Sequence, residues 1–131
     1  MKVHHIGYAV RDIENALEGF YQLGFVLESR NADESRRVCI AFLRNGETLV
    51  ELVAPDDSDL PSPIDEVLKK VGPSPYHICY IVEDIDNQCK SLKKEGWSIL
   101  IKRSPAPAID NAPVAFLFRK SVGIIELVEQ P

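Results

Sequence analysis

Four residues with chemically useful side chains occupy matching positions in two copies of one sequence pattern. The first copy begins with HHIGYAVRDIENAL at residues 4–17, and the second begins with YHICYIVEDIDNQC at residues 76–89. At this offset His5 corresponds to His77. The copies end on similar apolar stretches, AFLRNGETLVELV and AFLFRKSVGIIELV, in which Glu51 corresponds to Glu126. A period this long in a chain of 131 residues indicates two copies of one supersecondary unit.

Each glutamate has two apolar residues on either side, so a sheet would bury it. A buried carboxylate is costly unless it is paired or bound to a metal ion. A structural histidine, or a glutamate on the solvent face of an edge strand, would explain any one of these residues alone. Their repetition favours a shared metal site formed by His5, Glu51, His77 and Glu126. Imidazole and carboxylate ligands suit Zn, Ni, Co, Fe or Mn without selecting strongly among them.

Neighbouring residues refine this hypothesis. A closed structural zinc site is the alternative, but such a site more usually contains cysteine. Gly7 and Ala9 share the face of His5 and leave space beside it. Cys79 shares the face of His77 and could line a pocket, although a buried, inert cysteine is the simpler interpretation. We exclude His4, because it points to the opposite face and has Tyr76 as its counterpart.

The elements that position these residues follow from local patterns. The first copy predicts a strand, a helix capped by Asp12 and ended by Gly24, and three more strands. Asn45-Gly46 predicts a type I′ turn between the last two, and the matching turn of the second copy is one residue longer. The second copy repeats this order, with its helix capped by Asp84. The expected strands cover residues 3–10, 25–30, 37–44, 48–54, 76–83, 97–103, 114–119 and 123–129.

Two connecting segments complete this organisation. Ser62-Pro63 predicts the start of a short helix in the linker. The proline-containing segment 104–113 predicts an extended loop, which could cover a pocket or simply join two strands. We expect a single domain over residues 1–131, with module 1 at 1–55, the linker at 56–74 and module 2 at 75–131.

Composition restricts the possible partners. The net charge of −5 and the absence of a basic block argue against nucleic acid. No apolar run is long enough to span a bilayer, and the N-terminus lacks a signal pattern. The three cysteines have no metal-binding or redox spacing, which predicts free thiols in the cytoplasm.

The duplicated motifs, from HHIGYAV to GIIELVEQ, closely resemble the vicinal oxygen chelate superfamily of glyoxalases, epimerases, extradiol dioxygenases and fosfomycin resistance proteins. The resemblance implies an α+β fold, in which two tandem βαβββ modules form an eight-stranded, cup-shaped sheet around a metal site. The implied ligands are His5, Glu51, His77 and Glu126, and the implied cofactor is one divalent ion per site, Zn, Ni, Co or Mn. A carboxylate at position 51 argues against the dioxygenase and fosfomycin branches.

Within the superfamily, the chain looks most like methylmalonyl-CoA epimerase and the short, single-domain glyoxalase I proteins. Its middle region, VELVAP, SPI and YHICYIV, looks like that of the epimerase. This resemblance implies a metal-dependent isomerase or lyase that transfers a proton next to a carbonyl through a metal-stabilised enolate. Glu126 or Glu51 would act as the base. The extra acid/base carboxylate of the epimerases has only loose candidates here, Asp33 and Glu34. The Asp-Pro-x-Gly approach to the last ligand in glyoxalase I is absent.

The resemblance leaves the substrate open. An acyl-CoA thioester is favoured slightly over the glutathione hemithioacetal of glyoxalase I (lactoylglutathione lyase). Six basic residues could contact CoA phosphates or a glutathione carboxylate, although scattered surface charge is the favoured explanation for them. These residues are Arg36, Arg37, Lys102, Arg103, Arg119 and Lys120. A non-catalytic small-molecule-binding protein of the same fold is the remaining alternative. Exposed sheet edges and the relatives both suggest a homodimer.

Overall fold

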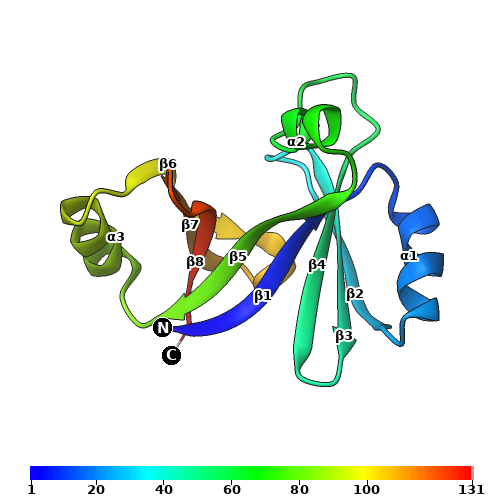
Figure 1. The fold of residues 1–131 in the computed structure, drawn as a ribbon, viewed down its shortest axis with the longest axis horizontal. Coiled ribbons are helices and arrows are strands. Elements are labelled where there is room, and N and C mark those ends of the chain that lie inside the picture. Colours follow the sequence, from blue (N-terminus) through cyan, green and yellow to red (C-terminus); the bar gives the residue numbers. More distant parts are fainter. Residues whose placement is uncertain (131) are drawn as a thin grey trace. The chain divides into compact units, whose positions relative to one another are not determined.

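The computed structural model describes residues 1–130 and has the predicted α+β organisation of two βαβββ modules (Figure 1). Module 1 contains β1 (Lys2–Ala9), α1 (Ile13–Gln22), β2 (Val26–Asp33), β3 (Val38–Asn45) and β4 (Thr48–Pro55). The linker carries α2 (Asp65–Lys70). Module 2 contains β5 (Ser74–Val82), α3 (Ile85–Lys94), β6 (Ser98–Ala106), the 3₁₀ turn η1 (Pro107–Ile109), β7 (Ala112–Arg119) and β8 (Gly123–Glu129).

The chain divides into two compact units, whose boundaries differ from those of the modules. The N-terminal unit is Ile6–Tyr76, and the C-terminal unit comprises Met1–His5 together with the chain from His77 onward. The first residues of β1 therefore belong with β5 and the strands that follow it.

The pairing of strands is the same in both modules. In module 1, β1 pairs parallel with β4, β4 pairs antiparallel with β3, and β3 pairs antiparallel with β2. The strand order is therefore β2-β3-β4-β1. In module 2, the equivalent pairings give β5-β8-β7-β6. The eight strands belong to one sheet, as the resemblance implied, and its pairings are mixed parallel and antiparallel.

Each long helix packs an apolar stripe on the strands of its own module. Ile13 and Leu17 of α1 are buried in a cluster with Leu43 and Leu52. Ile85 of α3 is buried in the corresponding cluster around Leu117. Burying a side chain of this size contributes about 1.5–3 kcal/mol, so these contacts hold each helix on its strands.

The predicted caps are present at both helix starts. The Asp12 carboxylate accepts a hydrogen bond from the Asn15 amide at 3.2 Å, and Asp84 accepts one from the Asn87 amide at 3.0 Å. Within the described residues, no helix is long and apolar enough to cross a membrane.

Two predictions about a helix start and a turn require correction. The linker helix starts at Asp65 rather than at Pro63. The Asp65 carboxylate accepts hydrogen bonds from the amide and the hydroxyl of Ser62, and the residues between them form a turn before the helix. The first hairpin turns at Gly46–Glu47, since Asn45 still pairs with Thr48, and only Gly46 of the two has a positive φ. This excludes type I′, which needs a positive φ at both central residues. The second turn, residues 120–122, is longer by one residue, as predicted.

The segment 104–113 is also more ordered than predicted. Its first residues extend β6 to Ala106, and Pro105 pairs with Pro113 across β6 and β7. β6 is the outermost strand of its module, and outer strands tolerate proline because one of their sides has no partner strand. Only η1 and the residues around Asp110 remain outside the strands.

Candidate metal centre

The C-terminal unit brings three of the four predicted site residues together. His5 lies on β1, His77 on β5 and Glu126 on β8. The parallel register of β5 with β8 sets Cys79 beside Glu126, and the antiparallel register of β7 sets Phe116 on its other side. Since side chains alternate along a strand, His77 and Cys79 share one face, which directs His77 and Glu126 to the same side.

The three side chains converge on one point. Oε1 of Glu126 lies 3.1 Å from Nε2 of His5 and 3.1 Å from Nε2 of His77. The two Nε2 atoms lie 3.3 Å from each other. We refer to these three residues as the His5–His77–Glu126 triad.

The triad is shielded from solvent, and its two imidazoles stabilise the negative charge of Glu126. His5 is 1% exposed, His77 is 4% exposed and Glu126 is 3% exposed. Burial acts to raise the pKa of Glu126, but the hydrogen bonds and charge of the two imidazoles outweigh it and lower that pKa well below its usual range. Glu126 is therefore ionised at neutral pH.

These distances fit a divalent metal ion. Two ligand atoms that each lie about 2.1 Å from one ion, at right angles, are about 3.0 Å apart. The separations in the triad are close to this value, and a single ion can therefore contact two imidazole nitrogens and one carboxylate oxygen. The set of donors suits Zn, Ni, Co or Mn.

The fourth predicted residue, Glu51, lies on β4 in the N-terminal unit and is 6% exposed. Its strand environment repeats that of Glu126. Gly7 of β1 is its parallel neighbour and Phe42 of β3 its antiparallel neighbour. Glu51 and Glu126 thus occupy equivalent registers, each beside the residue two positions after the histidine of its module.

The sequence did not predict three residues around the triad, two that contact it and one that reaches it through His4. Strand alternation predicts that His4 points away from His5, yet Nδ1 of His4 lies 2.7 Å from Nδ1 of His5. The Gln130 side-chain amide lies 3.5 Å from Nε2 of His4. The Phe116 ring packs edge-on against His77 at 5.5 Å. The HH dipeptide was the available signal for His4, whereas no local pattern marks Gln130.

The candidate carboxylates for an additional base are placed differently. Asp33 is 2% exposed, and both its oxygens are already used. Oδ1 accepts bonds from the Ser35 hydroxyl and the Arg36 amide, and Oδ2 accepts one from the Arg36 guanidinium at 2.6 Å. Glu34 is exposed. These contacts give Asp33 a role in shaping the turn after β2.

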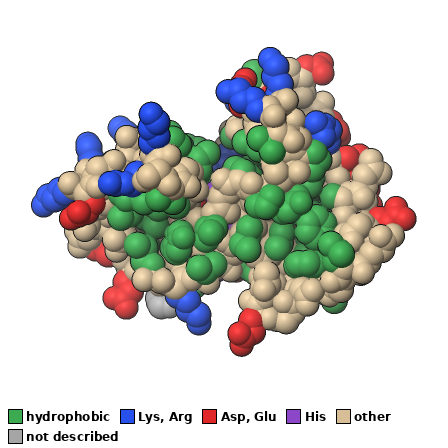
Figure 2. All heavy atoms as spheres, in the orientation of Figure 1, with side chains coloured by type: hydrophobic (Ala, Val, Ile, Leu, Met, Phe, Trp, Pro, Cys, Tyr) green, Lys and Arg blue, Asp and Glu red, His purple; other side chains and the backbone are tan. Residues whose placement is uncertain are grey.

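Several of the candidate anion-binding side chains are committed to local contacts. Arg103 pairs with Asp86, Arg37 donates to the Pro61 carbonyl, and Arg119 donates to the Glu95 carbonyl. Lys and Arg side chains on the visible face occur singly or in small groups (Figure 2). Lys102 and Lys120, both exposed and both in the C-terminal unit, are the better candidates for contacting an anionic substrate.

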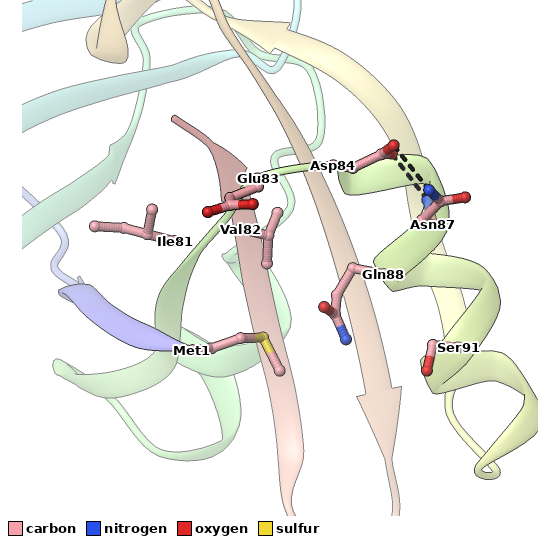
Figure 3. Close-up of a pocket in the computed structure, with 8 residues that line it drawn as sticks. All are labelled: Met1, Ile81, Val82, Glu83, Asp84, Asn87, Gln88 and Ser91. Atoms are coloured by element: carbon pink, nitrogen blue, oxygen red, sulfur yellow. Dashed lines mark hydrogen bonds between the residues drawn. The ribbon is translucent and has the colours of Figure 1, made fainter. Parts of the chain in front are cut away.

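A surface pocket of the C-terminal unit is lined by residues other than those of the triad (Figure 3). Met1, Val82 and the first turns of α3 line it, and Asp84 is occupied there in capping the helix through Asn87. None of the triad residues lines this pocket. It therefore adds no chemistry to the candidate metal centre.

Comparison with known proteins places the chain in a family. Residues 4–116 match the model of the glyoxalase/bleomycin resistance protein/dioxygenase superfamily. The uncharacterized protein YqjC of Bacillus subtilis is 30% identical over 98% of this chain and 91% of its own length. The ethylmalonyl-CoA/methylmalonyl-CoA epimerase of Cereibacter sphaeroides is 31% identical over 91% of this chain and 89% of its own length.

Solved structures agree with these relatives. The hypothetical protein BH1468 from Bacillus halodurans superimposes with a TM-score of 0.86 at 30% identity, covering 99% of this chain and 94% of its own. The methylmalonyl-CoA epimerase from Mycobacterium tuberculosis gives 0.84 at 27% identity, covering 99% and 88%. A methylmalonyl-CoA epimerase in complex with methylmalonyl-CoA and NH4+ gives 0.82 at 25% identity, covering 98% and 94%.

The chain belongs to the glyoxalase/bleomycin resistance protein/dioxygenase superfamily. Its similarity to methylmalonyl-CoA epimerases extends over nearly the whole chain.

Proposed function

We propose that this protein is a metal-dependent epimerase of acyl-CoA thioesters that carry a carboxylate on the α carbon, such as methylmalonyl-CoA or ethylmalonyl-CoA. The observation that carries this proposal is the His5–His77–Glu126 triad, whose donor atoms are mutually 3.1–3.3 Å apart in a buried site. The epimerases similar to this chain act on these thioesters by name, and one of them is solved with methylmalonyl-CoA bound.

The same proposal makes Glu51 the fourth ligand. Its support is the register of β4, in which Glu51 repeats the position that Glu126 has on β8. A buried glutamate with a small residue on one side and a phenylalanine on the other occurs in both modules. With two imidazoles and two carboxylates, a divalent ion would be held without net charge, which suits a buried site.

A bound divalent ion would act as a Lewis acid that withdraws electron density from the thioester carbonyl of a substrate. The residues of the chain would supply the proton transfers. The C2 hydrogen of methylmalonyl-CoA lies next to that carbonyl. Inversion requires a carboxylate on one face of C2 to take this proton and a protonated carboxyl on the other face to deliver a different one. We assign these two groups to Glu51 and Glu126, which would exchange roles in the reverse direction.

Burial of the triad favours this chemistry in a second way. Because His5, His77 and Glu126 are all less than 5% exposed, water competes weakly for a carbanion formed beside them. Asp33 is not assigned as a base, since both of its oxygens accept hydrogen bonds from Ser35 and Arg36. Exposed Lys102 and Lys120 would contribute to CoA binding through the phosphates.

Deuterium exchange tests the proposal directly. Purified protein loaded with Zn, Co, Ni or Mn is incubated in D₂O with methylmalonyl-CoA or ethylmalonyl-CoA, and loss of the C2 proton is followed by NMR. Separate samples receive methylglyoxal with glutathione. We expect exchange with the thioesters, and loss of the metal with chelator should abolish it.

Variants test the contribution of each glutamate. Glu126→Gln and Glu51→Gln should each lower the exchange rate by about 10²–10⁴-fold, the range for a general base, and should weaken metal binding. Glu66→Gln, on the exposed face of α2, is the matched control and should exchange normally. Exchange in neither thioester, or turnover of the glutathione adduct alone, would overturn the proposed function.

A further inference from the structure

Of the two triad histidines, His5 alone has its second ring nitrogen beside a histidine outside the triad, among the residues that the structure describes. Its Nε2 faces Glu126, while its Nδ1 lies 2.7 Å from Nδ1 of His4. The other nitrogen of His4, Nε2, lies 3.5 Å from the side-chain amide of Gln130. The contacts therefore form a chain, Gln130–His4–His5–Glu126, within the C-terminal unit.

The chemistry of imidazole gives this chain a direction. A neutral imidazole carries one proton, so of its two nitrogens one donates a hydrogen bond and the other accepts. If Nε2 of His5 offers its lone pair to a metal ion, the proton must be on Nδ1, which then donates to Nδ1 of His4. His4 in turn carries its proton on Nε2 and donates it toward Gln130.

The amide of Gln130 can accept that bond. The oxygen and nitrogen of a glutamine side chain are exchanged by a half-turn of the amide group, and their positions are assigned from hydrogen bonding. With the oxygen toward His4, each link of the chain has one donor and one acceptor. Partners of this kind orient metal-binding imidazoles and raise their basicity.

We propose that His4 and Gln130 are positioning residues, which hold His5 in the Nδ1-protonated form with Nε2 directed into the metal centre. This inference rests on the proposed metal site. It also explains an asymmetry of the sequence, because the residue before His77 is Tyr76, which lacks an imidazole nitrogen at this position. The position before His77 therefore offers no imidazole of this kind, although the modules are repeats.

Metal affinity measures this support independently of turnover. Dissociation constants for Zn and Co are obtained by competition with a coloured chelator for wild type, His4→Phe, His4→Asn and Gln130→Ala. His4→Phe keeps a ring but removes the acceptor, and should weaken binding about 10–100-fold. In His4→Asn the amide oxygen takes the place of Nδ1, so affinity should return close to the wild-type value. Gln130→Ala should cause a smaller loss, because its contact is longer.

A second measurement reads the tautomer itself. Long-range ¹H–¹⁵N NMR of the zinc-loaded protein should show the His5 proton on Nδ1 in wild type and in His4→Asn. Val3→Ala, a neighbouring exposed position on β1, is the control for local disturbance of the strand. Near-UV circular dichroism and thermal unfolding establish that each variant is folded.

The outcomes distinguish the inference from the proposed function. Equal zinc affinity in wild type and a folded His4→Phe would overturn the inference, as would a His4→Asn variant as weak as His4→Phe. Zinc bound through Nδ1 of His5 would overturn it as well. If wild type binds zinc and these variants behave as expected, but no thioester exchanges deuterium, the proposed function fails while the positioning role stands.

Discussion

At the scale of single residues, two buried carboxylates are stabilised in different ways. Glu126 lies between two imidazoles, and all three side chains could bind one metal ion. Asp33 is held by a guanidinium, a hydroxyl and a backbone amide from its own turn. The first arrangement leaves the carboxylate available for chemistry, whereas in the second both oxygens accept hydrogen bonds that hold the turn.

The contacts of Asp33 predict a pH-dependent contribution to stability. Burial acts to raise its pKa, but the bonds from Arg36 and Ser35 lower it below the ordinary value of 3.8. Folding therefore favours the ionised form. The contribution is fully present above the pKa of the unfolded chain and is lost as the pH falls through the lower, folded pKa.

We expect Asp33→Asn to lower the free energy of unfolding by about 1–3 kcal/mol at pH 7. Urea unfolding of both proteins from pH 7 down to pH 3 measures the difference, which should shrink once the pH drops below 3.8. Asp59→Asn, at an exposed position of the linker, is the control. A difference that stays constant over this pH range would show that the charge of Asp33 is unimportant.

Sequence could predict the members of the triad, but not all of their neighbours. The repeat identified three residues that the structure brings together, because a histidine and a glutamate occur at matching positions of both copies. These residues are His5, His77 and Glu126. His4 was not predicted, because side chains of neighbouring residues in a strand point to opposite faces. Its ring nitrogen nevertheless contacts that of His5. Ligation by the triad and by Glu51 remains a prediction until metal binding is measured.

At the scale of elements, the helix caps were the most predictable feature. Asp12 and Asp84 occupy matching positions of the repeat, and both bond the amide three residues later. The ends of β6 were less predictable. Prolines normally indicate a loop, but β6 is an outer strand, where a missing amide costs nothing on the open side. Whether a strand is central or outer depends on the whole sheet and is not visible locally.

The cap of α3 gives a prediction at this scale. Asp84→Ala should destabilise the protein by about 1 kcal/mol, because the Asn87 amide loses its acceptor. Asp84→Asn should recover most of this loss, since its amide oxygen can accept the same bond. Chemical denaturation of the three proteins under one condition makes the comparison. Equal stability of the alanine and asparagine variants would contradict the capping role.

At the scale of the whole molecule, the sequence repeat and the compact units do not coincide. The repeat divides the chain near residue 75, whereas the C-terminal unit also includes Met1–His5. For this reason His5, from the first module, joins His77 and Glu126, from the second. A repeat shows which segments are alike, but not which of them fold together, because that depends on pairing between strands far apart in sequence.

The two outer strands of the sheet differ in how they are protected, and this difference predicts where two copies would associate. β2 carries charged side chains, including Arg30 and Glu28, which pair with neighbours in their own unit and discourage association. β6 instead exposes three successive apolar residues; Ile99 is 38% exposed, Leu100 52% and Ile101 37%. Irregular register on either side of Ile101 disfavours a continuous ladder with a second β6, so side-chain packing should hold the copies together.

We therefore expect a homodimer that buries Leu100. Light scattering after size exclusion should give twice the chain mass of 14.7 kDa for wild type and the monomer mass for Leu100→Lys. Leu23→Lys, which changes an exposed leucine at the end of α1, should remain dimeric and controls for added charge. Since the Leu100 side chain is 52% exposed, Leu100→Lys should keep its fold. If it dimerises as wild type does, the association surface is not β6; if wild type is monomeric, the exposed apolar residues of β6 have another role.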